Sequence, residues 1–314
     1  MSRPLLVDVS RHIVKLPARG VEIALLDWGG PGPLALLHHA NGFCAGTWGL
    51  SAERLRPHFR VLAIDARGHG DSTAPPPGAA YRWIEFVHDL LGVAEHVCAE
   101  HGRPVAYGIG NSFGGLVTAY AAALRPDLFQ RIALLDPVIR PPAPMLAEMR
   151  AKMSKIAQSE IGAGGENPMA IAARRRQQVW PSREVARDVW SGKEMFRDWD
   201  PRALQLYVDE GMRDRPDGQV ELKCRGEVEA SVFDAAGALD IFEVTDRVLA
   251  PCLIVRAGRG YFPMDVYREL VARMRDARLV ELDIDHLMPM HNPPELGALL
   301  LEFAGIEEAA SDRG

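Results

Sequence analysis

The chain has 314 residues, of which 47% are hydrophobic and 25% are charged, and its formal net charge at pH 7 is −6. This balance is typical of a globular protein with a sizeable core. The negative charge argues against nucleic acid or an anionic membrane as a partner. No apolar run is long enough for membrane insertion, and the first residues lack a signal-peptide pattern.

The positions of the cysteines and histidines indicate the redox state of the thiols and bear on whether the protein binds a metal. The four cysteines are scattered without a close pair, which indicates reduced thiols and a cytoplasmic location. They are Cys44, Cys98, Cys224 and Cys252. No His, Cys or Asp cluster has the spacing of metal ligands, so we expect neither a metal nor a cofactor.

Strands and helices alternate along the chain. Residues 12–20 and 21–30 predict a strand pair joined near Gly20. Helices are expected around 86–97, where apolar residues recur at helical spacing, and at 113–126, which Pro126 ends. Continuous apolar runs predict strands of a parallel sheet covered on both faces, hence an α/β fold. These runs are 33–40, 59–72 with its Gly-rich end, 104–110, 130–137, 251–258 and 277–284, followed by a helix at 293–305.

One segment breaks this alternation. Residues 139–244 show helical pattern without a convincing buried strand and open with "RPPAP", a linker signal. We therefore predict an inserted, mostly helical lid, with 1–138 and 245–314 forming the core. Its run "ARRRQQ" is expected to be a solvated helix face. The insertion holds methionines at helical spacing, Met145, Met149 and Met153, and four large aromatic residues, Trp180, Trp190, Phe196 and Trp199.

The stretch "GNSFG", Gly110 to Gly114, matches the pattern G-x-S-x-G between a predicted strand and a predicted helix. In this motif the serine occupies a strained turn, and small residues two before and two after it avoid clashes. Ser112 is therefore the candidate nucleophile, with Gly110 and Gly114 as the glycines of its turn.

A serine hydroxyl needs a general base to become a nucleophile. The fold in which this motif occurs orders its triad as Ser, acid, His along the chain, which favours a histidine after the last strand. His286 follows that strand directly, whereas His291 is closer to the next helix and is expected to be a capping or surface residue. His69 precedes Ser112 and is expected, with Arg67, to brace the turn "RGHG".

With these motifs the chain resembles the α/β-hydrolase superfamily, as a serine hydrolase with a lid. "LLHHANGFCAGTW" resembles the family's loop after the third strand, and "DARGHGDS" its turn after the fourth. "GNSFGG" resembles the nucleophile elbow, and "DIDHLMPMHNPPEL" the histidine loop and last helix. The resemblance implies a mostly parallel, doubly wound sheet of the eight-stranded type with an inserted helical lid.

The acid of the triad remains open between two residues. The family's usual carboxylate after the seventh strand is missing from "LIVRAGRGYFPMD", where the first carboxylate is Asp265. Some members carry the acid after the sixth strand, and Asp136 lies there. We favour Asp136, and expect Asp265 to serve at the start of the helix that follows it. Asp283 and Asp285 are too close in sequence to His286.

The family's oxyanion hole implies two backbone N–H donors. One follows the nucleophile and belongs to Phe113. The other comes from the loop after the third strand, where we expect Phe43, although two extra residues interrupt the family's usual His-Gly pair. His38 and His39 in this loop are expected to be structural anchors.

These residues predict a serine hydrolase that cleaves an ester or lactone of a small apolar molecule through an acyl-enzyme. C–C bond hydrolysis or acyl transfer would use the same residues, and a ligand receptor on a hydrolase scaffold is the alternative from another class. The sequence does not decide between a monomer and a homodimer.

Overall fold

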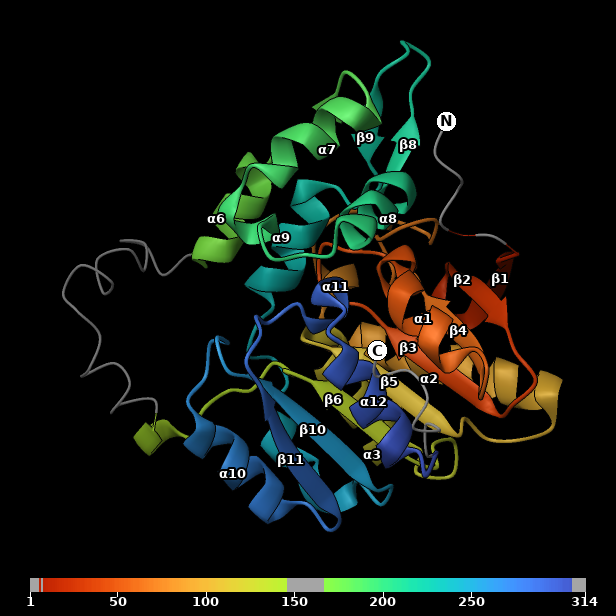
Figure 1. Ribbon diagram of the computed structural model, residues 1–314, viewed down its shortest axis with the longest axis vertical. Helices are drawn as coiled ribbons and strands as arrows, with labels where there is room; N and C mark the ends of the chain where they lie inside the picture. Colours follow the sequence, from red (N-terminus) through yellow and green to blue (C-terminus); the bar gives the residue numbers. More distant parts are fainter. Residues whose placement is uncertain (1–5, 7, 146–166, 307–314) are drawn as a thin grey trace, which may run out of the picture.

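The computed structural model of the chain describes residues 6, 8–145 and 167–306 (Figure 1). Its centre is an eight-stranded sheet in the order β1-β2-β4-β3-β5-β6-β10-β11. β2 pairs antiparallel with β1 and β4, and the other neighbours pair in parallel. The strands are β1 (Ser10–Leu16), β2 (Val21–Gly29), β3 (Leu34–His38), β4 (Arg60–Ile64), β5 (Tyr107–Asn111), β6 (Ile132–Leu135), β10 (Cys252–Ala257) and β11 (Ala277–Leu282). The predicted fold class is confirmed.

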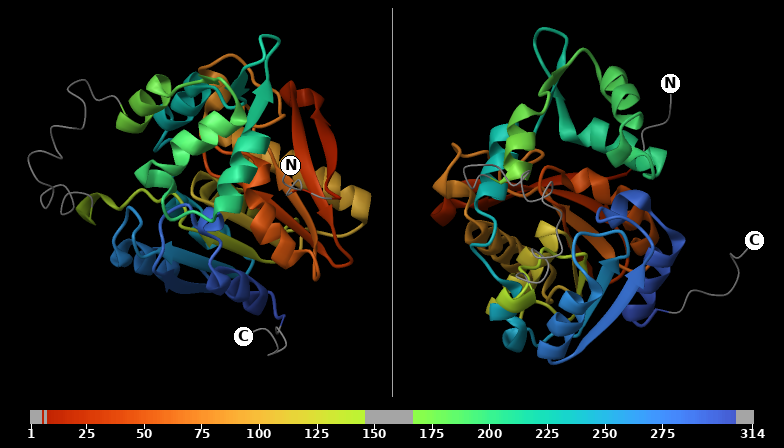
Figure 2. Two further views of the ribbon diagram at one scale, coloured as in Figure 1. Left: turned by 45° about the horizontal axis from the view of Figure 1, so that its top comes forward. Right: turned by 90° about the vertical axis from the view of Figure 1, so that its left-hand side faces the viewer.

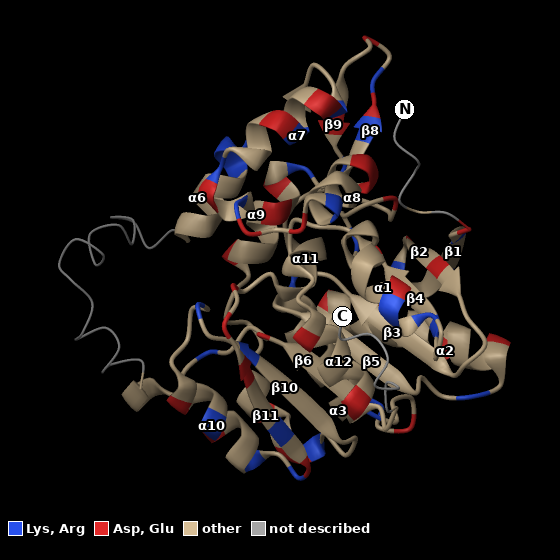
Figure 3. Cartoon of the chain, viewed as in Figure 1, with Lys and Arg blue, Asp and Glu red and all other residues tan. Residues whose placement is uncertain are grey.

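Helices cover both faces of this sheet, as the continuous apolar strands require. On one face, α2 (Trp83–His101), α3 (Phe113–Leu124) and α10 (Met264–Arg273) pack against side chains such as Leu36 and Ile254. On the other face, α1 (Gly49–Leu55) and α12 (Pro294–Phe303) pack against their strand neighbours, including Leu37 and Val255. The central strands β3, β5 and β6 carry no Lys, Arg, Asp or Glu (Figure 3).

Strand register aligns the carboxyl ends of the central strands. His38 at the end of β3 lies beside Gly110 of β5, and Asn111 of β5 lies beside Leu135 of β6. Leu135 in turn pairs with Val255 of β10. The residues that follow these strands therefore meet at one edge of the sheet, where open α/β sheets place their ligand sites.

The segment between β6 and β10 contributes a separate group of elements at one end of the molecule (Figures 1 and 2). Its helices are α6 (Pro168–Arg175), α7 (Arg183–Ser191), α8 (Pro201–Gly211) and α9 (Gly226–Asp234). The expectation that this segment lacks strands is wrong. A small antiparallel sheet, β7-β9-β8, is formed by β7 (Val179–Trp180), β8 (Met212–Asp214) and β9 (Val220–Leu222). Strands of two or three residues are too short to give a periodic signal.

The aromatic residues of the insertion form a core shared with the loop after β3. Trp180, Trp190, Phe196 and Trp199 are all buried and pack with Tyr207 of α8. Phe43 of that loop packs against Trp199 and Tyr207, so the cluster stabilises both the insertion and its contact with the loop. Met149 and Met153 of the methionine stripe lie outside the described residues.

None of the helices in the described part of the chain is both long and apolar enough to cross a membrane. All four cysteines are free thiols. Within the described residues, no group of three or more His, Cys, Asp or Glu side chains is arranged to hold a metal ion.

Candidate active site

Ser112 occupies a strained turn between β5 and α3. Its backbone has φ 57° and ψ −120°, a conformation that costs an ordinary residue free energy and that clusters at functional sites. The two flanking glycines are required sterically. A Cβ on Gly110 would lie 2.2 Å from the Gly114 carbonyl oxygen, and a Cβ on Gly114 would lie 2.3 Å from the His38 carbonyl oxygen. The strand, the turn and the helix can pack this closely only with glycine at both positions.

The structure brings Ser112 and His286 together across 174 residues of sequence. The distance from His286 Nε2 to Ser112 Oγ is 2.6 Å. Asn111 helps to hold the histidine loop, since its side-chain amide donates to the carbonyl oxygens of Leu135 and His286 at 2.8 and 3.0 Å. Ser112 is 8% exposed and the His286 side chain 17%, so the pair is shielded from bulk water but remains reachable.

Asp136 completes a chain of hydrogen bonds with these two residues. Its Oδ2 lies 2.5 Å from His286 Nδ1. Because a carboxylate can only accept, Nδ1 carries the proton, which leaves Nε2 to accept from the Ser112 hydroxyl. Asp136 is itself in the left-handed region, with φ 43°, directly after β6. Its Oδ1 accepts from the Ala257 N–H at 3.0 Å and from the Tyr267 hydroxyl at 2.5 Å.

The alternative acid, Asp265, lies elsewhere. It is in the first turn of α10, where its carboxylate accepts from Arg268 at 3.0 Å. Its side chain is 71% exposed, whereas Asp136 is 1% exposed. The placement at a helix start agrees with the role expected for Asp265 from the sequence.

Two N–H groups in the loop after β3 donate hydrogen bonds within the protein. The Phe43 N–H, expected to face an oxyanion, donates to the Ala40 carbonyl oxygen at 3.2 Å. The Gly42 N–H donates to His69 Nε2 at 3.0 Å. Asn41 directly precedes Gly42, and its N–H donates to no acceptor within the part of the chain that the structure describes. The N–H of Phe113, at the start of α3, likewise has no backbone acceptor among these residues.

Two of three buried histidines, His39 and His69, fasten this loop to the turn after β4, while His38 Nδ1 lies 3.0 Å from the adjacent His39 carbonyl oxygen. His39 Nε2 accepts from the Ala66 N–H at 2.9 Å, and His69 Nδ1 lies 2.9 Å from the Arg67 carbonyl oxygen. Burial lowers the pKa of His38 and of His69 to about 4 and the pKa of His39 well below its usual value. All three are therefore neutral at pH 7, and His39 and His69 act as anchors because a neutral imidazole can accept at one nitrogen.

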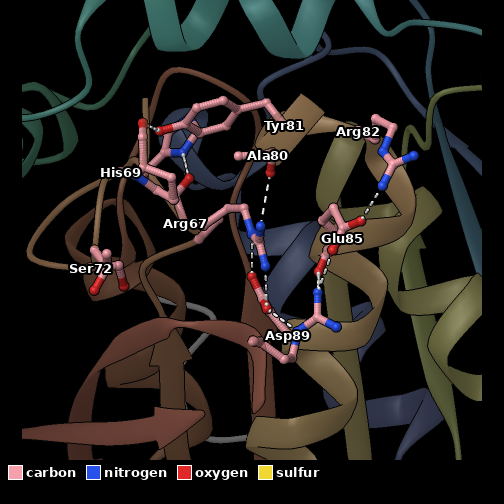
Figure 4. Close-up of polar contacts among 12 residues, drawn as sticks. Arg67, His69, Ser72, Ala80, Tyr81, Arg82, Glu85 and Asp89 are labelled. Carbon is pink, nitrogen blue, oxygen red and sulfur yellow. Dashed lines mark hydrogen bonds and ion pairs between the residues drawn. The ribbon is translucent and has the colours of Figure 1, made fainter. Parts of the chain in front are cut away.

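A buried ion-pair network holds the turn after β4 against α2 (Figure 4). Arg67 donates to both carboxylate oxygens of Asp89, at 2.6 and 2.7 Å, and to the Ala80 carbonyl oxygen at 2.8 Å. Arg19 donates to the same Asp89 carboxylate at 2.6 Å. Arg67 and Asp89 are 4% and 2% exposed. This geometry fixes the Arg67 carbonyl oxygen that orients His69.

The insertion contacts the loop after β3 directly. The Tyr207 hydroxyl donates to the Gly42 carbonyl oxygen at 3.1 Å, and the Asn41 amide donates to the Glu229 carbonyl oxygen at 3.0 Å. Arg176 donates to Glu229 at 2.9 Å and to the Tyr207 hydroxyl. The expectation of a solvated face is therefore wrong for Arg176, which is enclosed by other residues of the insertion.

Sequence reasoning missed two tyrosines at the site. Tyr267 bonds the Asp136 carboxylate, and the ring of Tyr261 lies edge-on to His286 with centroids 4.8 Å apart. Tyr261 is 66% exposed, which places an aromatic side chain beside His286 and in contact with solvent. Only their position soon after β10, in the segment where a family carboxylate was sought, could have drawn attention to them.

Comparison with known proteins identifies the class. A model of the alpha/beta hydrolase family matches residues 35–298, and the chain belongs to this family. Solved structures with the same fold include E-2-(acetamidomethylene)succinate hydrolase (TM-score 0.72, 20% identity, covering 95% of this chain and 99% of that one). Another is the enol-lactonase of Burkholderia xenovorans LB400 (TM-score 0.64, 24% identity, covering 91% and 97%).

Curated relatives hydrolyse several kinds of bond. The chain is 35% identical over 135 residues to a type I acyl-CoA thioesterase of Penicillium brevicompactum, covering 43% of this chain and 27% of that protein. It therefore spans about a quarter of the length of that fungal relative. It is 25% identical over 245 residues to the N-formylmaleamate deformylase of Pseudomonas putida, covering 77% of each.

The contacts of Gly110 lead to a first prediction. Gly110→Ala should destabilise the fold by about 1–3 kcal/mol, because its Cβ would overlap the Gly114 backbone, and should displace Ser112. The matched control is Gly192→Ala, where the nearest atom lies 3.7 Å away and φ is −82°. Urea unfolding of both variants tests this, and equal stability of the two would contradict it.

The lowered pKa values of the buried histidines predict that the folded protein loses stability in acid. In the unfolded chain these histidines have a pKa of about 6.5 and bind protons below that pH, whereas in the folded chain they stay neutral until about pH 4. The free energy of unfolding therefore falls as the pH drops from 6.5 towards 4. The loss is about 3 kcal/mol each for His38 and His69. Asp65 opposes it, because burial raises its pKa to about 6 and the folded chain then gains a proton between pH 6 and 3.8.

Urea unfolding at several pH values measures this slope. His69→Gln should flatten the slope by one proton, and His96→Gln, at an exposed position, should leave it unchanged. Stability that is independent of pH between 6.5 and 4 would contradict the assignment.

Proposed function

We propose that this hydrolase cleaves carboxylic esters, lactones or thioesters of small apolar molecules through an acyl-enzyme on Ser112. The observation that carries the proposal is the hydrogen-bonded series from Ser112 through His286 to Asp136. It has the distances at which a general base can take the serine proton. It also has a buried carboxylate to orient the base and stabilise its cation.

In the proposed first step, Ser112 Oγ attacks the carbonyl carbon and its proton passes to His286 Nε2. The carbonyl π electrons move to oxygen, giving a tetrahedral oxyanion. The oxyanion electrons then re-form the carbonyl while the C–O or C–S bond breaks, and the leaving group departs with that electron pair and takes the proton from His286. In the second step water attacks the acyl-enzyme, His286 takes its proton, and the acid leaves as Ser112 recovers its hydrogen.

The oxyanion needs donors that are free before the reaction begins. The Phe113 N–H is the first proposed donor. For the second, Asn41 is the better candidate than Phe43, because the Phe43 N–H would have to release the Ala40 carbonyl oxygen. His39 and His69 would hold the loop in place during this step.

The lid is proposed to be residues 139–244. Two hydrogen bonds support this proposal, since the Tyr207 hydroxyl donates to the Gly42 carbonyl oxygen and the Asn41 side-chain amide donates to the Glu229 backbone carbonyl oxygen. A substrate would then lie between the lid and Ser112, with the exposed Tyr261 beside it. An apolar or ring-bearing substrate suits this aromatic neighbour.

Amide hydrolysis is a second candidate, favoured by the deformylase relative that covers 77% of this chain. The same nucleophile and base would serve, and His286 would protonate the leaving nitrogen. C–C bond hydrolysis, acyl transfer and a receptor role without turnover remain the alternatives that product analysis separates.

A fluorophosphonate probe tests the nucleophile. We expect it to label Ser112, because this serine alone has both a strained turn and a bound histidine among the described residues, and Ser112→Ala should lose the label and the hydrolytic activity. Peptide mapping and intact mass measure the result. Labelling of Ser112→Ala at the rate of the unmodified protein would contradict the proposal.

A substrate panel tests the bond that is cleaved. It should contain p-nitrophenyl esters of increasing chain length, lactones, an acyl-CoA thioester and an N-formyl amide. We expect ester or thioester turnover that depends on Ser112. A labelled Ser112 without turnover of any member would instead favour the receptor alternative.

A further inference from the structure

The carboxylate of Asp136 is buried and, among the described residues, has no Lys or Arg partner. Its ion-pair partner within the described residues is His286, and neither Lys nor Arg pairs with it there. The nearby Arg256 donates to Glu281 and to the Phe262 carbonyl oxygen. A buried anion needs hydrogen-bond donors to offset the loss of water, so the donors around Asp136 decide how its charge is distributed.

These donors are divided between the two oxygens. Among the described residues Oδ2 accepts only from His286, at 2.5 Å, while Oδ1 accepts from the Ala257 N–H and the Tyr267 hydroxyl. The Oδ2 side is kept open by Gly260, where a Cβ would lie 2.7 Å from that oxygen. The carboxylate is thus oriented from both sides, with one oxygen reserved for the histidine.

Tyr267 is well placed to fix this orientation. It lies on α10, is fully buried, and packs in the core beside Val266 and Leu270. Its hydroxyl is 2.5 Å from a carboxylate oxygen, the distance of a charge-assisted hydrogen bond. Burial and the adjacent Asp136 raise the pKa of Tyr267, so its hydroxyl keeps the proton that it donates.

We propose that Tyr267 is a positioning residue of the active site, which holds Asp136 Oδ2 towards His286 and takes up part of the carboxylate charge. This inference rests on the proposed function, since it concerns how the acid acts on the base. Tyr267 touches neither the substrate nor Ser112 and acts through Asp136.

Tyr267→Phe removes the hydroxyl and keeps the ring in the core. Without this donor, more negative charge resides on Oδ2 and attracts the imidazolium more strongly. The acid limb of the kcat/KM profile should therefore move to higher pH, by about one unit or less. We also expect kcat to fall by about tenfold with KM unchanged, because the Ala257 N–H alone then holds Oδ1 and the carboxylate is aligned less precisely with His286 Nδ1.

The matched control is Tyr120→Phe. Tyr120 is also buried in the core, and its hydroxyl donates to the Asp240 carbonyl oxygen at 2.7 Å, away from the triad. It should lower the melting temperature to a similar extent and leave the pH profile in place. Equal pH profiles and equal kcat for the two variants would show that Tyr267 is only structural.

A spectroscopic measurement reports on the same bond without turnover. The proton between Asp136 and His286 should give a strongly downfield proton NMR resonance in the unmodified protein, and Tyr267→Phe should shift it while Tyr120→Phe should not. An unshifted resonance in folded Tyr267→Phe would overturn the inference. Activity that survives in Ser112→Ala would instead refute the proposed function, so the two failures are distinguishable.

Discussion

The hydrogen bond between Asp136 and His286 joins two loops that are 150 residues apart in sequence, and the arrangement of the site depends on it. Asp136 follows β6, and His286 follows β11, with β10 between these strands in the sheet. The bond can form only if β10 and β11 are added in that order and register. The geometry of the candidate triad is therefore a consequence of sheet topology, since parallel strands bring their carboxyl ends to one edge.

Close packing around Ser112 sets the second condition. The glycines on either side let α3 approach β5 and the end of β3 without overlap, and the strain at Ser112 is held by that packing. The neutral histidines His39 and His69 then connect the loops after β3 and β4, and the Arg67–Asp89 pair holds the turn after β4 against α2. These groups are buried and satisfied by short polar contacts, so the loop facing Ser112 is fixed before any substrate arrives.

Much of this arrangement could be predicted from the sequence, because it rests on local signals. The apolar runs predicted a parallel sheet and an α/β fold. The G-x-S-x-G turn indicated Ser112 as the nucleophile, and the position directly after the last strand indicated His286 as the base. The acid stayed open because Asp136 and Asp265 both follow strands, and only the folded sheet brings one of them to the histidine. The strands β7–β9 could not be predicted, because two or three residues are too few to show an alternating apolar pattern. The role of Tyr267 could not be predicted either, because Asp136, to which it donates, lies 131 residues away in sequence.

The central claim, that Asp136 orients and stabilises His286, is tested most directly by comparing kcat/KM of Asp136→Asn and Asp265→Asn. An amide at position 136 cannot stabilise the imidazolium and can favour the wrong tautomer, so we predict a loss of about 10⁴-fold, as this substitution causes in a serine protease. Asp265→Asn should retain nearly full activity, because that exposed carboxylate contacts Arg268. Normal turnover by a folded Asp136→Asn protein, with an inactive Asp265→Asn, would contradict the account.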